Sequence, residues 1–447
     1  MHIDGKPLPR PENAVPLYSW FVLIILVGVY SCNWMDRYLL YILIEPIHRE
    51  LHLSDKAMGF VTGFAFSTMY SLAGLAFGRW ADWGSRRAVL SLAIAGWSTM
   101  TGLTSLAGNY LTLVLARFGV ASFEAGCSPT AYSLISDYFT PQFRGRAISI
   151  YSLGIGIGMW AGATFGGWAN DLFGWRAAFM ILSIPGLLLA IVVFLFVREP
   201  VRGGTDPAVR KDDAAPSLRE GFRFLLQRRA FVGAALALGL LCVTSSSFEG
   251  WVPTYLMRVR GMNSSDVGVL TGSGGMAGIA ATMVIGLLCD RLSRRDPRWY
   301  LWLPIISFAL VIPSERLFFR SSGAWAYFFY CVTLFGTGGF TAPLFTVGQF
   351  LLPPRVRAFG AAAMLFILNM VGMGGGNFGV GLISDLLKDR YGDGSLETAI
   401  LSLQVSSLVG IGALFYASVW LARDIVSSEE KDRPALATSD DQVPAAT

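Results

Sequence analysis

Charged residues are scarce in this chain. Asp, Glu, Lys and Arg make up 15% of its 447 residues, against about 25% in a typical soluble protein. Hydrophobic residues make up 53% and form long runs between residues 17 and 423. A bilayer core of about 30 Å takes roughly 20 apolar residues in helical form, and lipid offers no partner to backbone amides. The composition therefore excludes a soluble domain, and the uninterrupted runs exclude the short alternating strands of a membrane barrel.

Histidine and cysteine are scarce too. The three histidines lie near the N-terminus, and the five cysteines fall in or beside apolar runs without CxxC spacing. This pattern favours ordinary packing over a metal site or a disulfide framework. No HExxH or GxSxG motif lies at membrane depth, so we expect neither an enzyme nor a cofactor. The net charge of +5 is not typical of a nucleic-acid-binding protein. The cysteines are Cys32, Cys127, Cys242, Cys289 and Cys331.

The apolar runs predict an all-α membrane protein with twelve transmembrane helices. A polar stretch divides them six and six, so we expect an N-terminal six-helix bundle at 1–199, a cytoplasmic central loop at 200–229 and a C-terminal six-helix bundle at 230–424. The polar remainder, 425–447, predicts a disordered cytoplasmic tail. The expected spans are 17–44, 57–80, 88–107, 110–139, 147–170, 177–197, 230–257, 267–288, 299–319, 324–352, 360–387 and 398–421.

Basic residues collect in alternate loops, which in a twelve-span topology all lie on one side of the membrane. The opposite loops carry fewer, and Gly108-Asn109 carries none. The positive-inside rule makes the basic side cytoplasmic, with both termini inside. We therefore expect an integral protein of the plasma (cytoplasmic) membrane. The basic residues at these segment ends include Arg79, Arg86, Arg87, Arg144, Arg146, Arg291, Arg294, Arg295, Arg298, Arg355 and Arg357.

A loop motif occurs once in each half of the chain. Residues 78–87 read GRWADWGSRR after the second span, and residues 286–295 read GLLCDRLSRR after the eighth. A duplicated six-helix unit is typical of transporters whose substrate site lies between two halves near the membrane midplane. The repeated element resembles the loop signature of the major facilitator superfamily. That resemblance implies two pseudo-symmetric six-helix bundles that work by alternating access.

The same resemblance implies a cytoplasmic gate. Asp82 would interact with the positive N-terminus of a helix in the other half, and arginines would bridge nearby carboxylates. A plain positive-inside anchor is the alternative interpretation. The expected gate residues are Asp82, Arg86, Arg87, Arg144, Asp290 and Arg294.

Charged residues inside the spans are the main functional candidates, because each costs roughly 2.5–3.5 kcal/mol at the bilayer centre. Asp36 and Arg117 fall at similar depth in the first and fourth spans. Glu124 lies about 10.5 Å beyond Arg117 along the helix, too far for a direct pair. We expect Asp36 and Glu124 to bind coupling protons, because a carboxylate that alternates between arginine-paired and protonated states links proton occupancy to conformation. A static ion pair is the alternative, and for Arg37 and Glu249 the two interpretations are evenly balanced.

A narrower resemblance comes from motifs in the first half. Residues 33–37, NWMDR, resemble the N-Y-x-D-R element of spinster-type transporters. The order of Arg117, Glu124-Ala125 and the DYF of 137–139 is similar to that family's R, E-A and D-x-F. The VREP of 197–200 resembles the segment that closes the family's first half.

The spinster resemblance implies transport of single-chain amphiphilic lipids, such as lysophospholipids or sphingosine-1-phosphate-like molecules, by a proton-linked or facilitated mechanism. We expect secondary active transport coupled to protons, and a monomer is the default for this class of transporter. An arginine would hold an anionic headgroup, and aromatic side chains would line the path of the tail. Each of these aromatics is also an ordinary core or interface residue. The expected substrate-binding residues are Arg37, Arg117, Glu249, Tyr41, Phe64, Tyr70 and Trp251.

Two alternatives remain open. A proton-coupled symporter of organic anions or sugar acids can also carry Asp-Arg in its first span. A lipid scramblase or receptor without coupled transport belongs to another class, and energy-independent lipid flip without saturation would favour it. The expected partners are membrane lipid and an amphiphilic small molecule rather than a nucleic acid.

Overall fold

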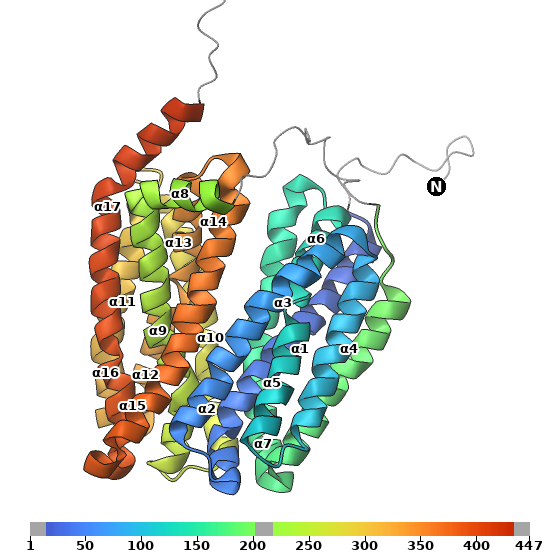
Figure 1. Ribbon diagram of the computed structural model, residues 1–447, viewed down its shortest axis with the longest axis vertical. Coiled ribbons are helices and arrows are strands. Elements are labelled where there is room, and N and C mark those ends of the chain that lie inside the picture. Colours follow the sequence, from blue (N-terminus) through green and yellow to red (C-terminus); the bar gives the residue numbers. More distant parts are fainter. Residues whose placement is uncertain (1–14, 202–217, 433–447) are drawn as a thin grey trace, which may run out of the picture. The chain divides into compact units, whose positions relative to one another are not determined.

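The computed structural model describes residues 15–201 and 218–432, and this part of the chain is built from helices without strands. The helices of each half run roughly along a common direction (Figure 1). Their bounds are α1 Leu17–Leu51, α2 Asp55–Thr62, α3 Phe64–Trp83, α4 Arg86–Thr104, α5 Tyr110–Glu124, α6 Cys127–Tyr138, α7 Pro141–Phe196, α8 Leu218–Gln227, α9 Arg229–Arg258, α10 Ser264–Leu292, α11 Trp299–Arg320, α12 Gly323–Gly338, α13 Thr341–Phe350, α14 Pro354–Ile367, the π-helix η1 Leu368–Gly374, α15 Gly375–Tyr391, the 3-10 turn η2 Gly392–Gly394, α16 Ser395–Ser402 and α17 Gln404–Asp432.

All twelve predicted spans are helical. Nine helical segments of the described chain are long and apolar enough to cross a membrane. Two of these, Pro141–Phe196 and Phe359–Ile425, each contain two predicted spans, and α4 supplies the remaining one. Several spans are built from two helices in succession, as α5 and α6 are, because glycine or proline interrupts the regular hydrogen bonding.

Contacts group the chain into two units. Unit 1 comprises Met1–Arg210 together with Pro253–Ser273, and unit 2 comprises Lys211–Val252 together with Gly274–Thr447. Unit 1 thus contains the end of α9 and the start of α10, which a division at residue 230 assigns to the C-terminal bundle.

A row of glycines brings α7 against α1 in unit 1. A Cβ atom added to Gly154 would lie 2.9 Å from the carbonyl oxygen of Val27, and one added to Gly158 would collide with the carbonyl of Ser31. The two backbones therefore approach more closely than any larger residue permits. Further along α7, Gly174 adopts φ +79°, a conformation that favours glycine and separates the fifth and sixth spans.

Unit 2 has its own apolar core, in which Leu238 of α9, Phe308 of α11 and Leu344 of α13 are fully buried. The eleventh span is not uniform: α14 passes through the π-helical stretch η1 before α15 begins. Within η1, a Cβ on Gly372 would meet the Cys242 side chain at 2.5 Å. Such π-helical turns are rare and often lie near functional sites.

Two expected boundaries differ from the structure. The central loop predicted at 200–229 contains a helix, α8, which lies at the end of unit 2 where α9 begins (Figure 1). Gly221 and Leu225 are buried while Arg219, Glu220 and Arg223 are exposed, so the helix is amphipathic. The tail was expected from residue 425, but α17 continues to Asp432. Residues 202–217 and 433–447 lie outside the described residues.

Candidate functional site

An ion pair is buried in the middle of unit 1. Arg37 of α1 donates from Nε to Oε2 of Glu124 at 2.8 Å, and their side chains are 8% and 0% exposed. Glu124 is the last residue of α5, where the fourth span is interrupted ahead of Pro129 in α6. Because proline cannot donate a backbone hydrogen bond, the helix breaks beside the carboxylate. The sequence had nominated both residues but had not paired them.

Asp36 contacts a different helix from its neighbour Arg37. Its Oδ2 accepts a hydrogen bond of 3.1 Å from Thr101 Oγ1 of α4, and both residues are buried. The guanidinium of Arg117, on α5, acts electrostatically on Asp36 and on Glu124 alike. The structure thus gathers Asp36, Arg37, Arg117 and Glu124 into one cluster, which we call the buried charge cluster. Thr101 was not anticipated, because a lone threonine in an apolar run gives no signal.

Aromatic rings hold the two arginines. The Cζ atom of Arg37 lies 4.7 Å from the ring centre of Phe66 and 4.9 Å from that of Tyr70. The Cζ atom of Arg117 lies 4.6 Å from the same Phe66 ring. Such cation–π contacts are worth about 2 kcal/mol or more when water is excluded. The Phe66 ring therefore stabilises both cations at once.

Several polar atoms of the buried charge cluster are unsatisfied. Oδ1 of Asp36, Oε1 of Glu124 and Nε of Arg117 are buried and have no hydrogen-bond partner among the described residues. Leaving such atoms unpaired costs roughly 1–3 kcal/mol each, and more for charged groups. The cluster is therefore equipped to bind something that supplies the missing hydrogen bonds: a proton for a carboxylate oxygen, or an acceptor for the arginine.

The aromatic residues predicted to line the path of the lipid tail separate into two groups. Tyr70 faces Arg37, and Tyr41 is buried within the electrostatic reach of Arg117. Phe64 is half-buried at the start of α3, and it is Phe66 that contacts the arginines. Two residues along a helix turn a side chain by about 200°, so only one of the two phenylalanines can face the cluster.

The predicted role of Trp251 in substrate binding stays a prediction. The side chain is fully buried in unit 2, and its Nε1 donates to the Asn377 carbonyl at 3.0 Å. Glu249, also in unit 2, is half-buried and accepts a hydrogen bond of 3.1 Å from Ser245 one turn earlier in α9.

Arg86 organises one end of unit 1, which we call the motif end. The side chain is buried and binds Asp137 of α6 as well as Glu199, with 2.8 Å from Nε to Glu199 Oε1. Glu199 follows α7 and also accepts hydrogen bonds from Ser85 Oγ and Arg87 N, both at 2.9 Å. Arg86 thus bridges carboxylates as expected, and both belong to unit 1. Glu199 had been quoted only as part of a family motif.

The surroundings of Glu199 favour its charged form. Partial burial by itself raises the pKa of this carboxyl, but the hydrogen bonds from Arg87, Arg86 and Ser85 outweigh that effect. The pKa of Glu199 therefore lies below its usual value. The carboxylate also sits at the N-terminus of α4, where the helix dipole stabilises negative charge.

The other expected gate residues lie in different settings. The Arg87 guanidinium stacks on Phe194, and Arg144 donates to the carbonyls of Ser136 and Phe139 at 3.0 and 3.2 Å. The side chain of Asp82 lies outside the described part of the chain. Asp290 and Arg294, the counterparts in the second copy of the motif, are exposed in unit 2.

A second ion network lies at the opposite end of unit 1 and was missed by the sequence analysis. Arg258, at the end of α9, binds Asp55 through two hydrogen bonds of 2.8 Å and Glu45 through one of 2.8 Å. The carboxylates come from α2 and α1 and are almost fully buried. Their pairing with Arg258 is one reason why residues 253–273 group with unit 1.

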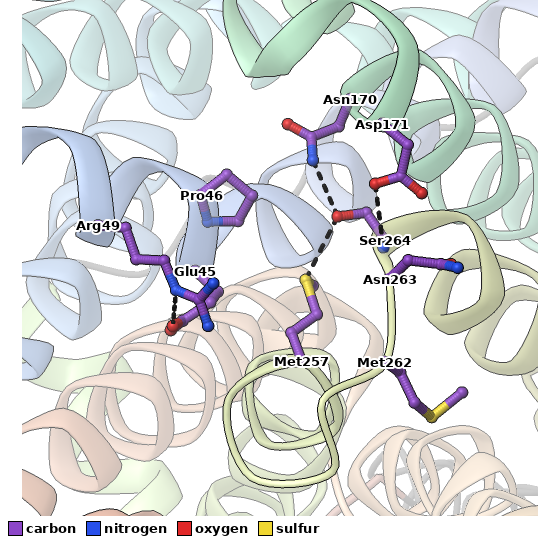
Figure 2. A pocket seen from close by; sticks show the side chains of 9 residues that line it. All are labelled: Glu45, Pro46, Arg49, Asn170, Asp171, Met257, Met262, Asn263 and Ser264. Atoms are coloured by element: carbon purple, nitrogen blue, oxygen red, sulfur yellow. Dashed lines mark hydrogen bonds and ion pairs between the residues drawn. The ribbon is translucent and has the colours of Figure 1, made fainter.

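Asp171 supplies the other reason. It accepts hydrogen bonds from the backbone amides of Ser264 and Ser265 at 3.2 and 2.7 Å, and so caps the N-terminus of α10 from α7. Figure 2 shows the adjoining pocket of about 310 Å³, in which Asn170 donates to Ser264 at 2.8 Å. The pocket is lined by Glu45, Pro46, Arg49, Asn170, Asp171, Met257, Met262, Asn263 and Ser264.

Comparison with known proteins decides the family. The sequence model of the Major Facilitator Superfamily matches residues 26–377 of this chain. The chain belongs to this superfamily. Its predicted fold is thereby confirmed, and the protein is a membrane transporter rather than an enzyme. The repeated loop motif and the buried charges of the first half had indicated this assignment.

Relatives narrow the resemblance to spinster transporters. A solved bacterial homolog of the human lysosomal transporter spinster, in an inward-facing and unoccupied conformation, is 26% identical with a TM-score of 0.84, and the match covers 92% of this chain and 99% of that one. The sphingosine-1-phosphate transporter SPNS2 of Danio rerio is 25% identical, over 90% of this chain and 83% of its own length.

Two further relatives carry other names. An MFS-type efflux pump of Mycolicibacterium smegmatis is 33% identical, over 92% of this chain and 95% of its own length. The probable galactarate/D-glucarate transporter GudP of Bacillus subtilis is 26% identical, over 70% of this chain and 74% of its own length. The predicted resemblance to spinster transporters is confirmed, and a sugar-acid transporter is also among the relatives.

Proposed function

We propose that this transporter moves single-chain amphiphilic lipids, of the lysophospholipid or sphingosine-1-phosphate type, by proton-coupled alternating access. The observation that carries the proposal is the buried charge cluster, which combines two carboxylates and two arginines with unsatisfied polar atoms on three of the four residues. Charges at membrane depth are costly and mark substrate or proton pathways.

The proton-binding groups of the proposal are Asp36 and Glu124. Glu124 is held by Arg37 at 2.8 Å, while its other oxygen is unpaired. Protonation of that oxygen would weaken the attraction to Arg37 and release the guanidinium. Release of the proton would restore the pair. Among the described residues, the hydroxyl of Thr101 is the one hydrogen-bond donor to Asp36, so the proton affinity of Asp36 would respond to movements of Arg117.

The arginines supply the substrate side of the proposal. Arg37 and Arg117 would bind the phosphate of the headgroup, since guanidinium groups form bidentate hydrogen bonds with such anions. Competition between the headgroup and Glu124 for Arg37 would then link substrate binding to protonation. The name of the SPNS2 relative, a sphingosine-1-phosphate transporter, supports a phosphorylated single-chain lipid.

The orientation in the membrane belongs to the same proposal. The motif end carries Arg86, Arg87 and Arg144, so the positive-inside rule makes it cytoplasmic and leaves both termini inside. The protein would act as a monomer in the plasma membrane. The relative named an efflux pump makes outward movement the first direction to test.

Transport into proteoliposomes tests the proposal. Labelled lysophospholipid is offered with and without an imposed pH gradient, to the unaltered protein and to Glu124→Gln. We expect saturable, gradient-dependent movement that falls at least tenfold in the variant. Glu50→Gln is the matched control, because the Glu50 side chain is 51% exposed at the end of α1. Gradient-independent movement in the unaltered protein would overturn the proton coupling.

A sugar-acid symporter is the second candidate, favoured by the relationship to GudP. The arginines that would bind a lipid phosphate could equally bind a carboxylate of a sugar acid. Labelled glucarate in the same liposomes separates the two: uptake of glucarate without lysophospholipid movement would replace the substrate class and leave the proton sites in place. Lipid movement that never saturates and ignores the gradient would instead indicate a scramblase.

A further inference from the structure

A second acidic side chain is fully buried in unit 2. Glu315 lies in α11, five residues before the helix ends at Arg320, and its exposure is 0%. Nothing in the sequence singles it out, because it stands next to Arg316 near the end of an apolar run. The neighbouring Ser314 is also buried, and its hydroxyl forms a hydrogen bond with the hydroxyl of Thr333 in α12. The carboxyl group is therefore enclosed by the core of unit 2.

Gln404, the first residue of α17, links Glu315 to its surroundings. Its Nε2 donates to Oε2 of Glu315 at 2.6 Å and to the carbonyl of Ile312 at 3.1 Å. Its Oε1 accepts from Nε of Arg316 at 3.1 Å. These bonds use both amide hydrogens and the amide oxygen of Gln404, so its orientation is determined. The guanidinium of Arg316 binds the amide in this arrangement.

The negative charge of an ionised Glu315 would thus be less well stabilised by neighbouring groups than that of Glu124. It has one neutral hydrogen-bond donor, and its Oε1 is buried with no partner among the described residues. Arg316 is the charged group that acts on it electrostatically. Of the other helices packed on α11, α12 and α13 contain no charged residue and α16 contributes Glu397. Helix α9, whose Phe248 ring contacts Phe318, contributes Glu249. An ionised carboxylate in such a place costs several kcal/mol, roughly, unless it is neutralised.

We propose that Glu315 is a proton-binding site of unit 2, which is occupied at neutral pH and which exchanges its proton with water. The bound proton removes the negative charge from the apolar core, and Oε2 continues to accept from Gln404. The ligand is a proton taken from solvent, so no other co-reactant is needed. The proposal concerns unit 2 alone and does not depend on which substrate the transporter carries.

Infrared spectroscopy of the purified full-length protein tests this directly. A protonated carboxyl group has a carbonyl stretching band that is separate from those of carboxylates and amides. We expect such a band at neutral pH, its loss in Glu315→Gln, and its retention in Asp393→Asn, which alters an exposed acid of the same unit. The band should shift on transfer to D₂O and disappear at alkaline pH.

Variants at Gln404 and Glu315 separate a proton site from a static polar bridge. Gln404→Leu removes the hydrogen bond that favours the ionised form, so its band should persist to higher pH than that of the unaltered protein. Glu315→Gln keeps an acceptor for Gln404 and should retain the melting temperature, whereas Glu315→Leu should lower it.

Two results would overturn the proposal. One is the absence of any neutral-pH band assignable to Glu315, which would mean an ionised bridge to Arg316 through Gln404. The other is a band that neither shifts in D₂O nor titrates before the protein unfolds, which would mean that the proton on Glu315 does not exchange with solvent. Both readouts use protein without substrate, so they stand apart from the lipid-transport assay.

Discussion

Each unit buries a glutamate completely, and the two are supported differently. In unit 1, Glu124 meets the guanidinium of Arg37 at 2.8 Å. In unit 2, Glu315 meets the neutral amide of Gln404 at 2.6 Å, and the nearby guanidinium of Arg316 binds that amide. A duplicated architecture can therefore hold one acid as half of an ion pair and the other as a neutral group. The residues that surround an acid, rather than the shared fold, determine its charge.

The two copies of the loop motif differ in the same way. Arg86 of the first copy is 3% exposed in its side chain and binds Asp137 and Glu199. Arg294 of the second copy is exposed. The first copy is thus part of the structure of unit 1, while the second presents its charge at the surface. Removing partners one at a time tests both halves of this comparison.

The largest effect is expected from Arg37→Ala. It leaves Glu124 buried without its cation, which costs roughly 3–5 kcal/mol of unfolding free energy. Gln404→Leu removes the three hydrogen bonds of a neutral amide and should cost less, about 1–3 kcal/mol. Denaturant unfolding in detergent measures both, and proteoliposome uptake should be abolished in Arg37→Ala. Equal losses in the two variants would remove the distinction between the acids.

Arg86→Ala should have the next largest effect, a loss of roughly 3 kcal/mol of unfolding free energy, because it leaves Asp137 and Glu199 at the motif end without their cation. Arg294→Ala, at the equivalent position of the second copy, should change stability by no more than about 0.5 kcal/mol. Melting temperatures of the two variants provide the comparison. If Arg294→Ala proved as damaging as Arg86→Ala, the two motif copies would be structurally equivalent after all.

Asp171→Ala should have a smaller and local effect. It removes the cap from the N-terminus of α10, which is worth about 1 kcal/mol. Hydrogen exchange should accelerate at the amides of Ser264 and Ser265, which Asp171 now binds. Exchange in unit 2 should be unchanged, and Asp393→Ala serves as an exposed-acid control. Unaltered exchange at both serines would show that the start of α10 is held by other contacts.

The smallest effect concerns acid sensitivity at the motif end. The pKa of Glu199 is below its usual 4.5, so its ionised form stabilises the fold above that pH. This contribution is lost as pH falls below 4.5 through the lower value of the folded state. In Glu199→Gln, stability should therefore fall less between neutral and acidic pH than in the unaltered protein. Parallel pH profiles for both proteins would assign the acid sensitivity elsewhere.

Much of this arrangement could be predicted from the sequence. The predicted spans are helical, because runs of about 20 apolar residues have no other stable form in lipid. Asp36, Arg37, Arg117 and Glu124 were correctly nominated as a group, since charges at membrane depth are rare. Their pairing could not be predicted. Spacing along α5 showed that Glu124 cannot reach Arg117, but it could not show that Arg37 of α1 would reach Glu124.

Other residues gave no signal until the helices were packed. Thr101, Phe66 and Gln404 are common residue types in apolar surroundings, and each becomes informative through one contact from another helix. Arg258 was not singled out from the sequence. Its importance comes from Glu45 and Asp55, which are more than 200 positions away in the chain.

The sequence by itself determined the helical membrane fold, the duplication and the superfamily, because hydrophobic length and repeated motifs are properties of the chain read in order. Only the tertiary structure decided which acid meets a guanidinium and which meets an amide. That choice depends on side chains from separate helices approaching within about 3 Å, the range of a hydrogen bond. At that distance the charge state of Glu124 and Glu315, and with it their chemistry, is set by neighbours that are remote in sequence.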